Sequence, residues 1–146
     1  MGVKKIPDGY GTVTPYLVVS DAAKLMEFVK AAFGAKELFR MNGPNGRIAH
    51  AEAQIGSSRV MMGEPMEPGK ETKAMLHLYV EDCDAMYGAA LNAGATSDRV
   101  PADQFYGDRS AGVQDPFGNY WYLSTHIEDV SEEEMGRRMQ KMAIAK

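Results

Sequence analysis

Three side chains of this 146-residue sequence are of the kinds that transfer protons or bind metal ions: His50, Glu52 and His77. His50 and Glu52 are two positions apart in a segment that alternates like a strand, so both are expected on one face. Imidazole and carboxylate groups serve as general acids and bases and as ligands of divalent metals. Three roles therefore stay open for these candidate catalytic residues: structural hydrogen bonding, metal-free acid–base chemistry, and metal ligation.

Tyrosines give the strand-like segments a second chemical character. In the segment 75–80 (MLHLYV), aliphatic residues alternate with Met75, His77 and Tyr79, so one face is expected to cover helices and the other to form an open surface. An aromatic surface with a few hydroxyl and imidazole groups suits a planar or amphipathic organic ligand. The alternative is that the tyrosines only fill a core. By the same alternation, the ligand-binding candidates on the open surface are Tyr79 in this segment and Tyr16, Tyr120 and Tyr122 in the other strand-like segments.

The segment 104–109 (QFYGDR) supplies two more candidates, Tyr106 and Arg109. A polar loop with aromatic residues could close over a pocket, and the guanidinium of Arg109 offers the fork of donors that binds a carboxylate or phosphonate. The alternative is a structural ion pair between Asp108 and Arg109. We therefore expect this loop either to contact the ligand or to be fixed by that pair.

The elements that position these residues are expected to form two similar halves. Asp21 is a good N-cap and Gly34 a good C-terminal stop for a helix with an apolar face between them. The first module, about residues 10–63, is expected to contain a strand at 12–19, a helix at 22–33, and strands at 36–42, 47–55 and 58–62.

The second module, about residues 74–126, follows a linker at 64–73 that is rich in proline and glycine (EPMEPGKETK). Its helix is expected to start at Asp82 or Asp84 and to end before Gly94. Caps and glycines recur about 61 positions on, since Val19-Ser20-Asp21 matches Val80-Glu81-Asp82 and Phe33-Gly34-Ala35 matches Ala93-Gly94-Ala95. The expected strands lie at 75–80, 95–100, 108–114 and 119–125.

A C-terminal helix is expected at about 131–145. Ser131 and Glu134 have the spacing of a capping box. Met135, Met139 and Met142 form an apolar stripe on this helix, which is expected either to dock on the protein's own body or to form a dimer contact.

Charge and composition indicate which kinds of binding partner and which cellular location to expect. The net charge of −4 and the pI near 5.4 argue against binding to nucleic acid, whose partners usually present a basic face. No apolar run approaches the roughly 20 residues of a membrane helix, and no signal peptide precedes the first strand. Because Cys83 is the only cysteine, no internal disulfide can form, and a cytoplasmic location is expected.

Three stretches carry a resemblance to a known family: VTPYLVVSDAAKLMEFVKAAFGA, IAHAEAQIGSSRVMMGE and QFYGDRSAGVQDPFGNYWYLSTHIEDV. Over about residues 10–129 the sequence resembles the vicinal oxygen chelate (glyoxalase / bleomycin resistance protein / dioxygenase) superfamily, and in particular its PhnB-like branch. The resemblance implies an α+β fold of two tandem βαβββ modules, whose strands form a paired cup-shaped sheet, plus the C-terminal helix. It also implies a homodimer, because members commonly pair their modules across subunits.

The resemblance implies four metal-ligand positions in metal-dependent members, one on the first and one on the last strand of each module. These fall at Thr14, Met61 or Met62, Met75 and Tyr122. Thioethers compete poorly with water for the usual divalent metals. We therefore expect no metal at that position and no other cofactor, with a displaced divalent metal at His50, Glu52 and His77 as the less favoured alternative.

The sequence thus favours a single domain that binds a small organic molecule in an aromatic pocket without the superfamily's usual metal. The alternative is an enzyme of the same superfamily, either a metal-dependent lyase or isomerase or a metal-free acid–base catalyst. A structural or regulatory interaction module is the third possibility. The expected partners are a small-molecule ligand and a second copy of the chain, with no nucleic acid and no membrane.

Overall fold

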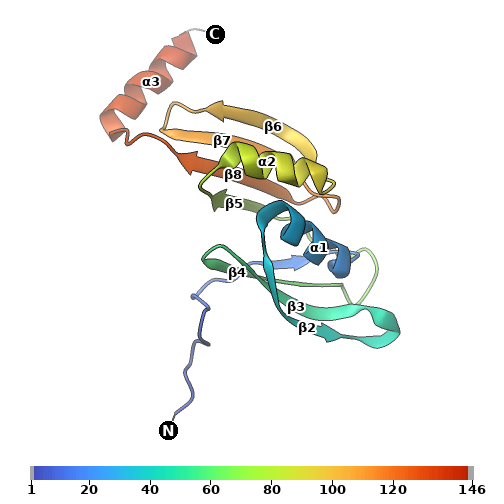
Figure 1. The fold of residues 1–146 in the computed structure, drawn as a ribbon. Coiled ribbons are helices and arrows are strands. Elements are labelled where there is room, and N and C mark those ends of the chain that lie inside the picture. The colour runs from blue at the N-terminus through green and yellow to red at the C-terminus, as the bar shows by residue number, and fades with distance from the viewer. Residues whose placement is uncertain (1, 145–146) are drawn as a thin grey trace.

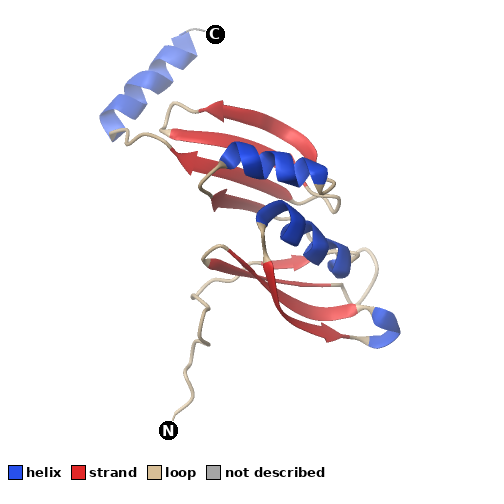
Figure 2. Ribbon diagram, viewed as in Figure 1, coloured by secondary structure: helices blue, strands red, loops and turns tan. Residues whose placement is uncertain are grey.

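The computed structural model describes residues 2–144, which fold into two βαβββ modules and a C-terminal helix (Figures 1 and 2). In chain order the first module contains β1 (Tyr16–Val18), α1 (Ala22–Phe33), β2 (Lys36–Asn42), the short 3-10 helix η1 (Pro44–Gly46), β3 (Ile48–Ile55) and β4 (Ser58–Gly63). The rest of the chain contains β5 (Met75–Tyr79), α2 (Cys83–Asn92), β6 (Thr96–Asp103), β7 (Asp108–Gln114), β8 (Tyr120–His126) and α3 (Glu132–Ile144).

The two sheets repeat one topology, which confirms the α+β fold of two modules. Their strand orders are β1-β4-β3-β2 and β5-β8-β7-β6, with the first pair of each sheet parallel and the others antiparallel. Tyr16 is paired with Met61, and His77 with Tyr122, 61 positions later in both strands. The repeat read from caps and glycines therefore extends to the register of the strands.

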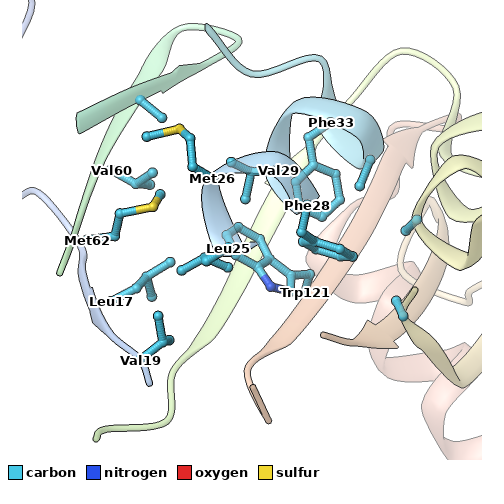
Figure 3. Close-up of a cluster of buried hydrophobic side chains, with 14 of the residues drawn as sticks. Leu17, Val19, Leu25, Met26, Phe28, Val29, Phe33, Val60, Met62 and Trp121 are labelled. Atoms are coloured by element: carbon cyan, nitrogen blue, oxygen red, sulfur yellow. The ribbon is translucent and has the colours of Figure 1, made fainter. Parts of the chain in front are cut away.

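The two modules share one core, formed where their helices meet. In Figure 1, α1 and α2 lie side by side, and each packs against the sheet of its own module. Figure 3 shows Trp121 of β8 among side chains of α1 in the first module. The rings of Phe33 and Trp121 are 4.8 Å apart, and Trp121 is fully buried. Burial of this apolar surface holds the two modules together.

The helices begin where the sequence predicts. The side chain of Asp21 accepts a hydrogen bond from the backbone N–H of Lys24, and Gly34 ends α1 with a φ of 66°, which favours glycine. In the second module, Asp82 and not Asp84 is the N-cap, because it accepts a hydrogen bond from the N–H of Ala85.

Two strands differ from the prediction by more than one residue, and each contains or follows a proline. β1 covers only three residues of the expected 12–19, since Pro15 has no N–H to donate and the chain before it is not paired. β6 runs on to Asp103 instead of ending at residue 100, despite Pro101. It is an edge strand with an irregular register between Arg99 and Ala102, where the missing N–H of a proline is tolerated.

The segment assigned to the linker begins with a residue that belongs to the first module. The Glu64 carboxylate accepts hydrogen bonds from the backbone N–H groups of Ala22 and Ile48 at 3.3 and 3.1 Å. Further along, the N–H of Thr72 donates to the carbonyl oxygen of Val18 at 3.0 Å. The connection therefore follows the first module before it enters the second.

Helix α3 extends beyond the second sheet (Figure 1). Arg138 ties its first turns to the body through Glu128 and the carbonyl oxygen of Phe105. Met135 is half-buried, whereas Met139 and Met142 are exposed, so most of the methionine stripe is not docked on the protein's own body. The last predicted helical residue, 145, lies outside the described residues. None of the helices within residues 2–144 is long and apolar enough to cross a membrane.

Candidate functional site

Tyr16, His50 and Glu52 form a hydrogen-bonded chain on the open face of the first sheet. The phenolic oxygen of Tyr16 lies 3.0 Å from Nδ1 of His50, and Nε2 of His50 lies 2.8 Å from Oε2 of Glu52. The His50 and Glu52 side chains are each about one-fifth exposed, at 22% and 21%. The structure thus brings together two of the three predicted catalytic candidates and one predicted ligand-binding tyrosine.

Local sequence explains why this chain can form. Ala51 and Ala53 are buried on the core side of β3, so alternation places His50 and Glu52 on the opposite face. Gly63 on β4 leaves the space that the Tyr16 side chain crosses, because a Cβ atom at this position would meet the phenolic oxygen at 2.9 Å. A larger residue at position 63 would also meet the carbonyl oxygen of Ala49 at 2.7 Å, so the close packing of β1, β3 and β4 here depends on glycine.

Tyr10 completes the chain, and sequence reasoning did not identify it. Its hydroxyl donates a hydrogen bond to Oε1 of Glu52, while the guanidinium of Arg59 lies 4.7 Å from the centre of its ring. Arg59 is fixed in turn by Oε1 of Gln54 at 2.9 Å. Tyr10 lies before the first strand, where strand alternation gives no signal, and its position depends on how the N-terminal segment returns to β3.

The open face of the second sheet carries the other tyrosines. The rings of Tyr120 and Tyr122 are nearly parallel, with an interplanar angle of 9° and centroids 6.3 Å apart. The hydroxyl of Tyr122 donates to Asp98 at 2.9 Å, and the Asp98 carboxylate raises the pKa of Tyr122. Gly112 is required beneath this ring, since a Cβ atom there would lie 2.6 Å from it. The predicted face alternation of β8 is therefore correct, with Trp121 on the buried side.

Tyr79 and His126 are joined through Asp108, which is buried. The Tyr79 hydroxyl donates to Oδ2 of Asp108 at 2.8 Å, and Nδ1 of His126 lies 2.8 Å from Oδ1. The bond to Asp108 raises the pKa of Tyr79, and bonds to Asp108 and Asp129 raise the pKa of His126. Burial alone would raise the pKa of Asp108, but the bonds from His126 and Tyr79 outweigh it, so the pKa lies below its usual value. The His77 ring lies beside that of Tyr79, tilted by 48°, with ring centroids 5.1 Å apart.

A buried hydroxyl without a partner lies in the same face. Ser124 of β8 is paired with Tyr79 on one side and Ser110 on the other. Its Oγ is fully buried and has no hydrogen-bond partner among the described residues, whereas Ser110 accepts a weak bond from Arg99 at 3.3 Å. Alternation along β8 puts Ser124 on the same face as Tyr120 and Tyr122, but alternation alone does not show that its hydroxyl is unpaired.

Arg109 does not reach either open face. Its guanidinium is bound by Asp84 of α2 at 2.7 and 3.0 Å and by Asp103 at 3.0 Å. The predicted Asp108–Arg109 ion pair is absent from the described residues, because neighbours on a strand point to opposite faces. Tyr106 is half-buried and packs edge-on against Phe105, with ring centroids 5.3 Å apart.

A groove of about 1490 Å³ lies between the modules. Its lining includes Arg59 and Val60 of the first module and His77, Tyr79 and His126 of the second, but not Tyr16, His50 or Glu52. The Tyr16, His50 and Glu52 side chains therefore lie outside the groove that Tyr79 and His126 line.

Comparison with known proteins agrees with this architecture. Residues 10–123 match the family model of the Glyoxalase/Bleomycin resistance protein/Dioxygenase superfamily. The chain belongs to this superfamily. The match covers both modules and ends inside β8, so it includes every strand that carries a candidate residue.

Relatives of the superfamily support the fold more than any activity. The uncharacterised protein Mb0911c of Mycobacterium bovis is 39% identical over 138 residues, which cover 87% of this chain and 91% of that protein. The crystal structure of TioX from Micromonospora sp. ML1 has 26% identity and a TM-score of 0.68, covering 80% of this chain and all of that one. The PhnB protein of Bacillus cereus, at 13% identity and a TM-score of 0.65, covers 79% of this chain and 99% of that one. This last likeness shows the fold alone.

The donor set does not fit the superfamily's metal site. In the structure, the residues paired with Met61 and Tyr122 are Tyr16 and His77. Two of the four expected ligand positions therefore change, because Tyr16 takes the place of Thr14 and His77 takes the place of Met75. One imidazole, two phenols and a thioether are a poor set for a divalent ion. Within residues 2–144 no three His, Cys, Asp or Glu side chains gather closely enough to hold a metal, so His77 does not join His50 and Glu52.

Proposed function

We propose that this member of the superfamily binds a small organic molecule on its aromatic sheet faces without the usual divalent metal. The observation that carries the proposal is the pairing of exposed aromatic rings with polar groups held by neighbouring side chains. Tyr16 is 43% exposed and Tyr79 67%, yet the hydroxyl of each is fixed by a hydrogen bond. Oriented polar groups on an apolar surface are typical of small-molecule sites.

A second copy of the chain is part of the proposal. The open faces expose large apolar side chains, which monomeric proteins rarely leave in contiguous patches. Because Tyr16, His50 and Glu52 lie outside the groove between the modules, we expect a partner subunit to cover them and exclude water from the ligand. The exposed apolar residues on and beside these faces are Phe39, Met41, Met75 and Tyr79.

Methionine methyl groups give a direct test of binding. Met61 and Met75 lie on the open faces, whereas Met26 and Met62 are fully buried in the core and serve as internal controls. NMR titration of ¹³C-methyl-methionine protein with 4-nitrophenol, nitrobenzene, indole and 4-hydroxybenzoate should shift the signals of Met61 or Met75 and leave those of Met26 and Met62 unchanged. Unchanged spectra with all four compounds at millimolar concentration would contradict the proposal.

Elemental analysis tests the metal-free part of the proposal. The protein is purified without chelators or affinity-tag metals and then titrated with Ni²⁺, Zn²⁺ and Mn²⁺. We expect no ion to be retained near one per chain. Stoichiometric retention that is lost in His50→Gln or His77→Gln would instead support the displaced metal site and a metal-dependent lyase or isomerase.

A further inference from the structure

We infer that Tyr16, His50 and Glu52 form a proton relay that accepts the proton of a ligand with an acidic hydroxyl group, a phenol or an enol, and holds that ligand as its anion. This inference rests on the proposed function, because it names the class of molecule that the first module binds and how it is held.

The hydrogen bonds of the relay have one consistent direction. Both carboxylate oxygens of Glu52 accept bonds, Oε1 from the Tyr10 hydroxyl and Oε2 from Nε2–H of His50. An imidazole that carries its proton on Nε2 has a lone pair on Nδ1. That lone pair faces the Tyr16 hydroxyl at 3.0 Å, so Tyr16 donates to His50 and turns its own oxygen lone pairs towards the ligand.

The proton balance of binding follows from this direction. The O–H bond of the ligand breaks, and its proton forms a bond with the phenolic oxygen of Tyr16. The original Tyr16 proton passes to Nδ1 of His50, which becomes an imidazolium ion beside the Glu52 carboxylate. The ligand keeps the electron pair as an oxyanion and accepts a hydrogen bond from Tyr16. This is the arrangement of a group activated by a base that is itself oriented by a carboxylate.

The groups around His50 include one partner for the charge that this transfer creates. The charged and titratable groups that face it are the Tyr16 phenol from β1, the Glu52 carboxylate from β3, and, behind Glu52, Tyr10 with the Arg59 cation over its ring. The Phe39 ring of β2 lies 6.2 Å from the imidazole and contributes no charge. An imidazolium at His50 would therefore be paired with one carboxylate, that of Glu52 at 2.8 Å.

The second module shows that the fold does not require this relay. By strand register, Gly112 pairs with Tyr122 as Glu52 pairs with Met61, so Ser110 occupies the position of His50. Neither a serine nor a glycine side chain can act as the proton acceptor that the relay needs. Imidazole is the side chain that gains and loses protons near neutral pH, so the first module alone has a proton acceptor at this point of the sheet.

The test uses 4-nitrophenol, whose anion and neutral form have different absorbance spectra. The measurement is made at a pH about one unit below the pKa of the free probe. In the presence of the wild-type protein, the ratio of anion to neutral phenol in the bound probe should be about ten times that in the free probe. Tyr16→Phe and His50→Gln should return the ratio of any bound probe to the free value. Tyr87→Phe is the matched control, since it removes a tyrosine hydroxyl that bonds Ser97 away from both open faces.

The outcomes of this experiment distinguish failure of the relay from failure of the proposed binding function. Binding of 4-nitrophenol with the free-probe ratio in the wild-type protein would overturn the relay and leave the proposed binding function standing. Binding of nitrobenzene without binding of 4-nitrophenol would also overturn the relay and leave the proposed binding function standing. If neither compound nor the other two titrated probes shifts the Met61 or Met75 signals, the proposed function fails and the relay with it. Circular dichroism and thermal melts of each variant verify that the loss of the spectral change is not a loss of fold.

Discussion

The indole N–H of Trp121 donates a hydrogen bond of 2.9 Å to the carboxylate of Asp115, a buried charge at the start of the DPFG turn. The same carboxylate accepts bonds from the backbone N–H groups of Phe117 and Asn119 and from the Asn119 side chain, at 2.8 to 3.0 Å. One side chain thus fixes the turn before β8 and orients the indole that joins the two modules.

Asp115→Ala should therefore destabilise the protein strongly. Removing the carboxylate leaves the buried N–H donors of Asn119 and Trp121, and the part-buried N–H of Phe117, without partners, and one buried donor costs about 1–3 kcal/mol. We expect the free energy of unfolding to fall by about 3 kcal/mol or more, measured by urea denaturation. Asp98→Asn is the control at an exposed carboxylate. A loss no larger than that of the control would show that the turn does not depend on Asp115.

Cys83 should be unreactive in the folded protein. The sequence places it at the start of a helix, a position that lowers the pKa of a thiol. In the structure it is buried, and burial together with the neighbouring Asp84 raises the pKa of the Cys83 thiol to about 11. Alkylation by iodoacetamide near pH 8 should be at least about tenfold slower in buffer than in concentrated urea, because little thiolate is present. Equal rates would show that the thiol is accessible and ionised.

These residues also show how far the sequence could predict the fold and the site. Caps, glycines and strand alternation are local signals, so they placed the helices, the two sheets and the open faces correctly. Hydrogen-bond partners depend on neighbouring strands, and the sequence could not show that His50 contacts Tyr16 and that Glu52 contacts Tyr10, while His77 lies beside Tyr79. For Arg109 it offered either a ligand contact or an ion pair with Asp108, whereas the guanidinium binds Asp84 of α2, 25 positions away in sequence. Long-range partners of long side chains were beyond alternation rules.

The stability contribution of His126 should disappear as the pH rises. The carboxylates of Asp108 and Asp129 raise the pKa of folded His126 above that of the unfolded chain. The contribution is therefore complete below the unfolded pKa and is lost as the pH increases through the higher folded pKa. Asp108 has a lowered pKa, so its own contribution is lost only when the pH falls through that low value.

His126→Gln should consequently lower the melting temperature most at about pH 5–6 and least near about pH 9. Thermal melts of both proteins across this range measure the difference. His77→Gln is the control, because His77 forms no salt bridge within the part of the chain that the structure describes. A difference between wild type and His126→Gln that is constant with pH would mean that the bonds to Asp108 and Asp129 do not depend on the imidazole charge.

The protein should be a homodimer in solution. Met75 and Tyr79 of β5 are 70% and 67% exposed, and they lie on an edge strand that pairs with β8 alone among the strands of residues 2–144. Apolar side chains on an unpaired edge are a site of association. Light scattering should give twice the chain mass of 16.0 kDa at micromolar concentrations. Met75→Glu should weaken the dimer, since a carboxylate would be buried against apolar surface, whereas Val100→Glu on the far edge strand β6 should leave it intact.

A mass of 16.0 kDa for the wild-type protein across this range would contradict the prediction of a dimer. A dimer unaffected by Met75→Glu would place the interface elsewhere, with the exposed Met139 and Met142 of α3 as the next surface to alter.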